Sequence, residues 1–298
     1  MRWEADVRLA DHTRYRIGGP ASRFGRVRSV SDLRDALQEL NGSAHRVLGW
    51  GANLLVADGG VRDAVLVLEG ELDWLRLGSN TVEAGAGAGI PSLVGEARRA
   101  ARTGFSFLEA VPGSVGGALR MNAGSPDTGI WDRVLWVEAM QPDGQIVRLS
   151  PEEAAPAYRS VAIPEEWVFL GGSFAAPPGE RETVEHEHTE RRVQKVESQV
   201  YDLPSCGSTW KNPGPPWGSA WELVDRAGMR GAVRGGAQIA EKHCNFIANL
   251  GGAQAADVLW LMQETRRRVH DLEGLWLEPE IRMWGFTPEE LAVVGGCP

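Results

Sequence analysis

A short stretch of the chain, 204-PSCGSTWKNP-213, brings together side chains that could do chemistry. Ser208 supplies a hydroxyl, Lys211 a cation and Asn212 an amide. Gly207 can adopt a positive φ or let a ligand come close to the backbone, which would place Ser208 at the mouth of a site. A Gly-Ser pair taken alone is more often an ordinary turn, so its interpretation depends on the rest of the chain.

Three glycine-rich stretches in the first half of the chain could hold phosphate oxygens: 49-GWGAN-53, 85-GAGAG-89 and 112-PGSVGGALRMNAG-124. Backbone N–H groups at such turns bind phosphate without any basic side chain. Tight β-turns explain each stretch taken singly, and for the three together a dinucleotide cradle and plain turns both stay open. A Rossmann domain is not expected, because Leu54 stands where the third glycine of its fingerprint belongs and no helix opens there.

The composition limits the class of protein. The chain has 298 residues and a formal net charge of −9 at pH 7, which argues against a general nucleic-acid binder. The three cysteines, Cys206, Cys244 and Cys297, show no C-x-x-C spacing and predict reduced thiols. No apolar run approaches the roughly 18 residues of a membrane span, and the first residues lack the apolar centre of a signal peptide. We therefore expect a cytoplasmic protein that does not enter a membrane.

Hydrophobic periodicity predicts the elements that position these stretches. Residues 29–40 are expected to form a helix with Ser31 as its N-cap, and its apolar face comprises Leu33, Ala36, Leu37 and Leu40. Pro91 opens a second helix over 92–103, with Gly104 just past its end. Residues 134–150 read as a hairpin around the Pro-Asp-Gly turn at 142–144.

The second half of the chain begins with a Pro/Gly linker that becomes a charged helix over 175–192, a plausible domain boundary. Its His186 and His188 could belong to a metal site, but a solvated helix face is the preferred interpretation. A long helix is expected over 254–274, with an apolar stripe of Val258, Leu259, Met262, Val269 and Leu272. The strand pattern over 275–286 is interrupted by Pro279, with Glu280 beside it.

Several motifs in order resemble those of the UDP-N-acetylenolpyruvoylglucosamine reductases, the flavoenzymes of peptidoglycan precursor synthesis. They lie between residues 13 and 285 and read RIGGPA, LGWGANLLV, EAGAGAG, AVPGSVGGALRMNAG, YRS, SCGSTWKNP, AEKHCNFIANLG and LEPEIRMWG. The resemblance implies an α+β fold, with an FAD-binding domain of the vanillyl-alcohol-oxidase (PCMH) type in two subdomains, 1–70 and 71–190. It also implies an α+β substrate domain over 191–298.

The same resemblance implies an activity. A cytoplasmic, monomeric enzyme would use FAD and NADPH to reduce UDP-N-acetylglucosamine enolpyruvate to UDP-N-acetylmuramate. The family's acid serine falls on Ser208, its glutamate on Glu280 and its arginine on Arg159. The chain departs from the family pattern at Cys206, where alanine is usual, and at Ala52, where a serine hydroxyl is missing. It also has no room for the loop in which one branch of the family carries a substrate-binding tyrosine.

The resemblance further implies which residues hold the ligands. FAD would be held mainly by backbone, by Gly49, Trp50, Gly51, Ala52, Asn53, Leu54, Gly85, Gly87, Pro112, Gly113, Ser114, Gly116, Gly117, Asn122, Ala123 and Gly124. The family's substrate-binding lysine falls on Lys195. Independently of the resemblance, a diphosphate ligand requires a cationic patch, which Lys195, Lys211, His243, Arg191, Arg192 and Lys242 could supply, and Asn212 and Asn245 could orient the uracil or the phosphates. A solvated helix explains the arginine pair as well as ligand binding does, and His243 could equally be a structural histidine.

These residue types suit the reduction of an enolpyruvyl ether. An arginine can bind a carboxylate through two parallel hydrogen bonds. Arg159 therefore suits the substrate carboxylate, into which negative charge moves during the reduction. A protonated Glu280 could donate a hydrogen bond to the same centre, and Ser208 would deliver the proton to carbon. Two other functions stay open: an FAD-dependent sugar or alcohol oxidase of the same flavin fold, and a nucleotide-sugar-binding module without catalysis.

Overall fold

The computed structural model describes residues 1–125 and 127–296, and contacts within it group them into two units. Unit 1 comprises residues 1–4, 23–50 and 63–197, and unit 2 comprises residues 5–22, 51–62 and the described chain from 198 onward. Cys297 lies outside the described residues. Helices and strands mix in both units, which confirms the predicted α+β fold.

The first unit holds most of the strands. Its elements are β1 (Trp3–Glu4), β3 (Pro20–Val27), α1 (Val30–Leu40), β4 (His45–Leu48), β6 (Val61–Leu68), η2 (Gly70–Leu72), β7 (Leu75–Leu77), β8 (Thr81–Gly85), α2 (Ile90–Arg99), η3 (Ser106–Leu108), α3 (Val115–Arg120), β9 (Gly124–Ser125), β10 (Thr128–Gly129), η4 (Ile130–Asp132), β11 (Val134–Met140), β12 (Ile146–Leu149), α4 (Pro151–Ala154), β13 (Val168–Ala175) and α5 (Arg181–Ser198). The first residues of β3 and β6 and the last of α5 belong to unit 2.

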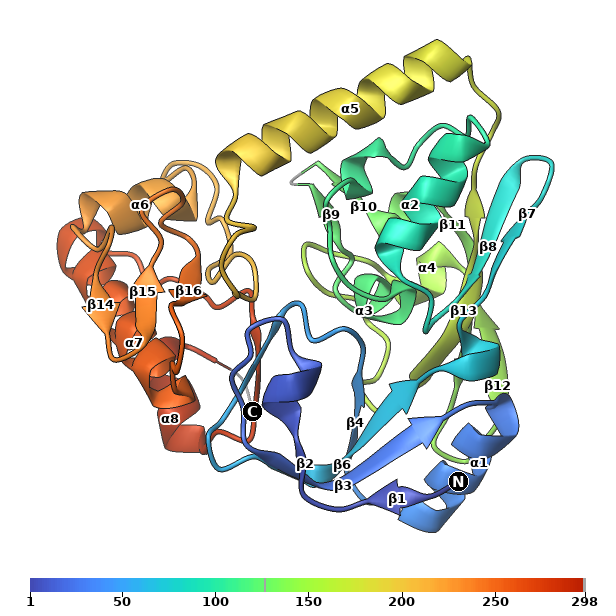
Figure 1. The fold of residues 1–298 in the computed structure, drawn as a ribbon, viewed down its shortest axis with the longest axis horizontal. Coiled ribbons are helices and arrows are strands. Elements are labelled where there is room, and N and C mark those ends of the chain that lie inside the picture. The colour runs from blue at the N-terminus through green and yellow to red at the C-terminus, as the bar shows by residue number, and fades with distance from the viewer. Residues whose placement is uncertain (126, 297–298) are drawn as a thin grey trace. The chain divides into compact units, whose positions relative to one another are not determined.

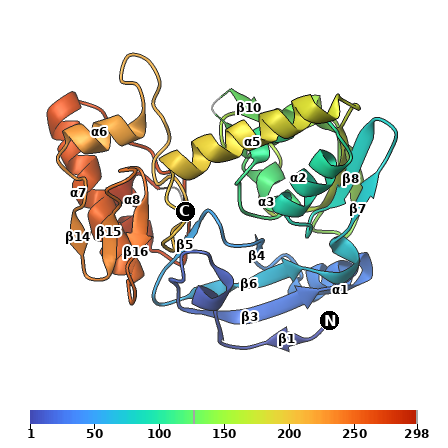
Figure 2. The same cartoon turned by 45° about the horizontal axis from the view of Figure 1, so that its top comes forward.

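Unit 1 is built on two sheets. One has the strand order β12-β11-β13-β8-β7 and is antiparallel. Helices α2 and α3 pack on it through a core that includes Val82, Leu93 and Leu119, and α5 lies beside α2 in both views (Figures 1 and 2). The other sheet has the order β1-β3-β6-β4, and its core with α1 includes Val27 and Leu66.

The second unit is assembled from three separate stretches of chain. Its elements are β2 (Val7–Arg8), η1 (Leu9–His12), β5 (Leu54–Val56), α6 (Ala220–Arg226), β14 (Val233–Arg234), β15 (Ala237–Ile239), β16 (Ile247–Asn249), α7 (Ala255–Glu273), β17 (Arg282–Trp284) and α8 (Pro288–Val294). Helix α7 packs against the antiparallel sheet β14-β15-β16 (Figure 1). Strand β17 pairs in parallel with β5, so residues from the first quarter of the chain complete this unit.

Local signals predicted several elements and misplaced some ends. The hairpin of β11 and β12 is confirmed, with Gly144 at φ +85°. The N-cap of α1 is Ser29, whose Oγ accepts the N–H of Asp32 at 3.1 Å, and not Ser31, which lies inside the helix. Helix α2 ends at Arg99 instead of continuing to 103, because Ala101 takes a left-handed φ of +49°.

The apolar stripe of α7 also differs from its prediction. Val258, Met262 and Val269 are buried as expected, together with Leu261. Leu272 is 58% exposed, because the last turn of the helix extends beyond the core.

The predicted boundary at 190/191 lies inside α5, whereas the two units divide at 197/198. The separation of residues 1–190 into two flavin subdomains stays a prediction.

Candidate active site

The predicted acid serine and the predicted glutamate come from neighbouring extended segments of unit 2. Two backbone hydrogen bonds of 2.8 and 2.9 Å pair residues 209–211 with residues 278–280 in antiparallel fashion. Ser208 directly precedes the first segment and Glu280 ends the second. The pairing therefore brings together the backbones of two residues that are far apart in the sequence.

The backbone conformation at Gly207 selects which side chain is accessible. Gly207 has φ +81°, which is one of the two possibilities that the sequence leaves open, and a Cβ there would meet nothing within 4 Å, so the conformation and not crowding requires glycine. Ser208 is partly exposed, whereas Thr209 and Trp210 are 1% and 2% exposed. Burial raises the pKa of the Cys206 thiol, so Cys206 packs as a neutral group and not as a nucleophile.

Asn53, predicted to bind the cofactor, holds the segment that carries Glu280. Its Nδ2 donates to the carbonyl oxygen of Glu280 at 3.1 Å, and its own carbonyl accepts the N–H of Arg282 at 3.0 Å. The turn at 51–53 is therefore hydrogen-bonded to the glutamate segment within unit 2. A contact of Asn53 with FAD stays a prediction.

The side chain of Asn245, a predicted substrate ligand, holds the serine segment, and a contact of Asn245 with substrate stays a prediction. Its Oδ1 accepts the N–H of Trp210 and its Nδ2 donates to the carbonyl of Trp210, both at 2.8 Å. Its carbonyl also accepts the N–H of Thr209 at 2.7 Å. Asn245 is 3% exposed, and its bonds to Thr209 and Trp210 fix the backbone that follows Ser208.

His243 lies next to Asn245 and is neutral. Its Nδ1 accepts the N–H of Asn245 at 3.3 Å, which leaves the proton on Nε2. Burial, together with the charge of Arg230, lowers the pKa of His243 below its ordinary value. His243 therefore offers a neutral N–H donor, and the cationic patch expected around substrate loses this member. Its ring packs edge-on against Phe246, with ring centres 4.9 Å apart.

The two other predicted substrate residues of unit 2 flank the serine segment. Nζ of Lys211 lies 3.3 Å from a carboxylate oxygen of Glu278, in an exposed ion pair. Oδ1 of Asn212 accepts the N–H of Ala220 at 2.9 Å, at the first residue of α6. Both side chains stay close to the surface, where a ligand could reach them.

Two predicted ligand residues lie in unit 1. Nζ of Lys195, on α5, donates to the carbonyl of Phe107 at 2.9 Å. Burial, followed by the positive charges of Arg191 and Arg159, lowers the pKa of Lys195 to about 8. Arg159 has a left-handed φ of +58°, and its Nη2 lies 3.5 Å from the carbonyl oxygen of Gly124. The pKa of Lys195 thus responds to the charges of both arginines, so Lys195 lies in a positive electrostatic environment.

A buried pair in the same unit was missed by the sequence analysis. His188 is 1% exposed and not on a solvated face, and its Nδ1 lies 2.8 Å from Oε1 of Glu109, which is 5% exposed. Burial raises the pKa of the Glu109 carboxyl. The hydrogen bond and charge of His188, with the charges of Arg98 and Arg192, have the larger opposite effect, so the pKa is lowered overall. The available signal was spacing, because Val184 and His188 are four residues apart and face the same side of α5.

The N-termini of α2 and α3 meet at the glycine turns. Their N-cap residues, Gly89 and Ser114, face each other in an antiparallel bridge, with backbone hydrogen bonds of 2.8 Å on either side. In such a pair the N–H groups of the two facing residues point away from each other, and neither donates to an acceptor within the described chain. Both residues are buried. Two orphaned donors at helix N-termini suit phosphate oxygens, so these turns fit the diphosphate of FAD.

The other predicted cofactor residues support this cradle in different ways. A Cβ on Gly49 would lie 2.4 Å from Oγ of Ser114, so the first glycine turn closes directly on the third. Trp50 is 44% exposed with its ring against Gly89. Four other predicted cofactor residues donate their N–H groups to acceptors within the protein, so these N–H groups are not free to bind phosphate. They are Gly85, Gly87, Gly116 and Gly117. Gly51, Ala52 and Leu54 lie in unit 2.

The turn at 122–124 is tied to the loop that carries the predicted arginine. The Nδ2 group of Asn122 donates to the carbonyl of Ala157 at 3.1 Å, and its Oδ1 accepts the N–H of Trp131 at 3.3 Å. Gly124 contributes its carbonyl to Arg159, as noted above. Predicted cofactor residues and the predicted arginine thus share one loop network, whereas contacts of Pro112, Gly113 and Ala123 with FAD stay predictions.

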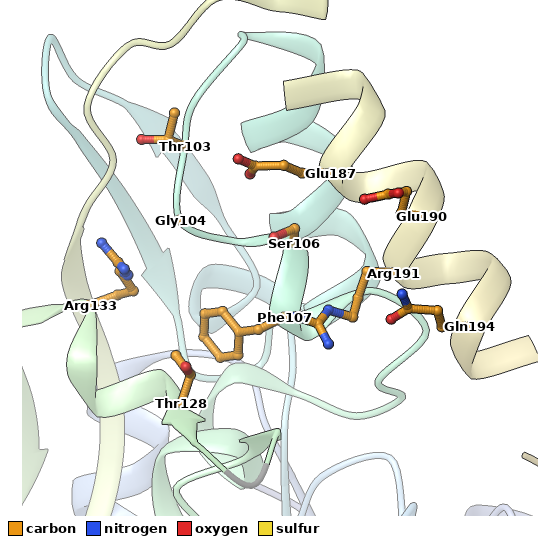
Figure 3. Close-up of a pocket in the computed structure, with 10 residues that line it drawn as sticks. All are labelled: Thr103, Gly104, Ser106, Phe107, Thr128, Arg133, Glu187, Glu190, Arg191 and Gln194. Carbon is orange, nitrogen blue, oxygen red and sulfur yellow. The ribbon is translucent and has the colours of Figure 1, made fainter. Parts of the chain in front are cut away.

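A cavity of about 460 Å³ lies beside α5 in unit 1. Figure 3 shows Arg191 and Gln194 on the helix side and Arg133 on the other, with the ring of Phe107 between them. Glu187 and Glu190 line it as well, so its charge does not favour an anion over a cation. Within the described chain, no helix is long and apolar enough to span a membrane, and no group of three His, Cys, Asp or Glu side chains could hold a metal ion.

Comparison with known proteins identifies the fold and the family. Residues 21–150 match the FAD binding domain model, and residues 198–284 match the model of the UDP-N-acetylenolpyruvoylglucosamine reductase C-terminal domain. The UDP-N-acetylenolpyruvoylglucosamine reductase of Paramagnetospirillum magneticum is 40% identical over 286 residues, covering 96% of this chain and 92% of its own. That of Rhodospirillum rubrum is 40% identical over 295 residues, covering 98% and 92%.

A solved structure agrees. The crystal structure of UDP-N-acetylenolpyruvylglucosamine reductase from Thermus caldophilus superposes with a TM-score of 0.84 at 35% identity, covering 95% of this chain and 99% of that one. Identity above 30% over nearly the full length, with both domains in order, leaves one assignment. The chain belongs to the UDP-N-acetylenolpyruvoylglucosamine reductase family.

Proposed function

We propose that the chain reduces UDP-N-acetylglucosamine enolpyruvate to UDP-N-acetylmuramate with FAD as cofactor and NADPH as hydride donor. Family membership over nearly the whole chain supports the reaction. One observation supports the division of roles within it, the backbone pairing that brings the segment after Ser208 against the segment ending in Glu280. When bound, FAD supplies the hydride chemistry by accepting a hydride from NADPH and passing it to the double bond.

The residues of the chain then act on the charge that this addition creates. Hydride adds to the enol carbon remote from the carboxylate, and the electron pair of the double bond moves to the other carbon and into the carboxylate. Arg159 holds that carboxylate, because a guanidinium stays charged and can donate two parallel hydrogen bonds. Ser208 gives its proton to the carbon, and a protonated Glu280 beside it donates a hydrogen bond to the enolate.

The surrounding residues hold the nucleotide part of the substrate. Lys195 and Lys211 supply positive charge for the diphosphate, which the net charge of −9 makes necessary. Asn212 and His243 supply neutral donors. We further propose a cytoplasmic monomer. The two free thiols in the described chain, Cys206 and Cys244, support a reducing compartment, and light scattering would measure the mass in solution.

The test of the reaction is NADPH oxidation with and without UDP-N-acetylglucosamine enolpyruvate. We expect a yellow holoenzyme whose NADPH oxidation requires the enolpyruvyl substrate. Turnover that is independent of this substrate would contradict the proposal and favour an oxidase.

The role of Ser208 is tested by separating the two half-reactions. NADPH reduces the flavin without a proton from Ser208, so this phase should survive Ser208→Ala unchanged. Reoxidation by substrate should slow by ~10²–10⁴-fold, the usual contribution of a general acid. Stopped-flow flavin absorbance follows both phases in one variant. Equal slowing of both phases would make Ser208 structural, and unimpaired reoxidation would exclude it as the donor.

A further inference from the structure

The geometry points to Asn245 as a positioning residue that fixes the proton donor Ser208 for the second half-reaction. The inference rests on the proposed role of Ser208 and goes beyond it. Asn245 reaches the residues after Ser208 through three contacts, two from its side chain to Trp210 and one from its carbonyl to Thr209. Such a residue acts through another one, without touching substrate itself.

The contacts of Asn245 match what a strand partner would supply. An amide side chain offers one acceptor and one donor at fixed spacing, and here they meet the N–H and the C=O of the same residue, Trp210, at 2.8 Å each. Aspartate supplies only acceptors when ionised, and leucine supplies neither. At 3% exposure, water cannot easily replace a lost bond.

The other side of the serine segment is held by the chain that carries Glu280. The N–H of Glu280 donates to the carbonyl of Thr209 at 2.8 Å, and Asn53 fixes the carbonyl of Glu280 from the far edge. Residues 209–210 are thus bonded on both edges, and among residues 1–125 and 127–296 only Asn245 uses a side chain to do so. Loss of the two side-chain bonds leaves this edge held only by the backbone bond from Thr209 to the carbonyl of Asn245, and the weaker hold lets Ser208 shift relative to Glu280.

The size of the expected effect follows from the distance dependence of catalysis. A misplacement of about 1 Å can cost ~10²-fold in rate, so we expect Asn245→Asp to slow substrate reoxidation by ~10- to 100-fold. Flavin reduction by NADPH should stay within about twofold, because it needs no proton from Ser208. A general loss of folding would affect flavin content and both phases together.

Asn249 provides a matched control in the same strand region. It is 5% exposed, and its Nδ2 likewise donates to a backbone carbonyl, that of Tyr15, at 3.0 Å. Asn249→Asp makes the same chemical change at a site that does not hold residues 209–210. We expect a comparable loss of thermal stability and no selective slowing of reoxidation.

Low pH should restore the reoxidation rate of the Asn245→Asp variant. When the new carboxyl is protonated, its O–H can donate to the carbonyl of Trp210 while its other oxygen accepts the N–H, as the amide does. The reoxidation rate of Asn245→Asp relative to the parent should therefore recover as pH falls from 8 to about 5.5. Both proteins keep the titratable neighbours His243 and Glu280, so dividing by the parent rate removes the pH response that the two proteins share, and Asn245→Leu, which adds no carboxyl, shows what remains. Asn245→Leu should show no recovery.

A double variant decides whether Asn245 acts through Ser208. In the Ser208→Ala background, Asn245→Asp should cause no further slowing, because residues that act as a unit are non-additive. Three results would each overturn the inference. Asn245→Asp could slow reoxidation equally with and without Ser208, it could slow flavin reduction as much as reoxidation, or Asn249→Asp could slow reoxidation just as selectively. If Ser208→Ala alone reoxidises at the parent rate, the proposed donor fails and the inference fails with it. A slow Ser208→Ala with a fast Asn245→Asp overturns this inference alone.

Discussion

At the scale of single residues, Arg159, the proposed ligand of the substrate carboxylate, has an unusual backbone conformation. A left-handed φ of +58° is rare outside glycine and costs about 1–2 kcal/mol. Such strain persists where the surrounding structure holds it, often at ligand-binding sites. The carbonyl of Gly124 and the ring of Tyr158, 4.9 Å from the guanidinium, are among the groups beside Arg159.

The first prediction is that Arg159→Lys is not a conservative change. Lysine has the same conformational cost as arginine at this φ and keeps the positive charge. The substitution therefore removes only the planar guanidinium and its two parallel hydrogen bonds. We expect kcat/KM for the enolpyruvyl substrate to fall by at least tenfold, with FAD content and reduction by NADPH unchanged. Steady-state kinetics with a flavin absorbance spectrum measure this, and an unchanged kcat/KM would remove Arg159 from the site.

The second prediction concerns the charge of Lys195. Its pKa of about 8 in the free protein means that it loses its proton near this pH. If substrate requires the charged amine, KM should rise above pH 8, by up to ~tenfold per pH unit. Lys195→Arg should abolish the inflection, because a guanidinium stays protonated. A flat KM between pH 7 and 9 in the parent would contradict the role.

The lowered pKa of Lys195 also predicts whether the free energy of unfolding rises or falls with pH. Between pH 8 and the ordinary lysine pKa of 10.5, the unfolded chain holds more protons at this position than the folded one. The free energy of unfolding therefore gains a contribution as pH rises through this window. Comparing urea midpoints of the parent and Lys195→Arg at pH 7.5 and 9.5 measures it, and only the parent should show this gain.

At the scale of elements, α5 is tied to the glycine-rich region by side chains and not by an extensive apolar face. Only Val184 and His188 are buried along its 18 residues. His188 bonds to Glu109 and Lys195 bonds to the carbonyl of Phe107, so both contacts fall on the segment that leads into the turn at 112–117. The helix thus positions Lys195 while it also fixes the approach to the predicted cofactor turn.

The third prediction is a large loss of stability when the buried pair is broken. His188→Leu leaves the carboxylate of Glu109 buried without its imidazole, which should cost roughly 3–5 kcal/mol. His186→Leu, at an exposed position of the same helix, should stay within about 0.5 kcal/mol. Urea unfolding of both variants measures the difference. Equal effects would show that the pair contributes little.

The pair also makes stability fall in acid. The pKa of Glu109 is lowered in the folded state by His188, Arg98 and Arg192. Its contribution is therefore complete above the ordinary carboxyl pKa and is lost as pH falls through the folded value. The free energy of unfolding of Glu109→Gln should therefore decrease less than that of the parent as pH falls into the acid range.

At the scale of the whole molecule, the order of the chain does not follow the order of the units. Unit 2 takes residues 5–22 and 51–62 from the first quarter of the sequence. These stretches supply β5, the partner of β17, and bury Tyr15, Ile17 and Leu55 in the core of the C-terminal residues. The C-terminal part therefore depends on distant sequence for its own core.

The fourth prediction is that residues 198–298 do not fold alone. The fragment lacks Tyr15, Ile17 and Leu55, and each fully buried side chain contributes about 1.5–3 kcal/mol, against a typical total stability of roughly 5–15 kcal/mol. It also leaves β17 without its partner. Circular dichroism should show no cooperative urea transition in the fragment, while the full chain shows one. A sigmoidal transition of the fragment would disprove this.

The sequence by itself determined features that depend on neighbouring residues. Gly207 takes its positive φ, the hairpin turns at Gly144, and the helix at 30–40 buries its expected face, because turns and helical faces follow from local sterics and periodicity. The ordered motifs also determined the family. Errors in the placement of elements stayed at their ends, as at Ser31 and in the last turn of α7, where several local solutions have similar energies.

Only the tertiary structure decided which partners these residues meet. The pairing of residues 209–211 with 278–280, the bonds of Asn245 to Trp210 and the burial of His188 against Glu109 all join distant parts of the chain. An asparagine in sequence is equally suited to ligand or backbone, and a histidine on a charged helix looks solvated. Their hydrogen-bond partners are set by burial, because a buried polar group must find its partner within the fold.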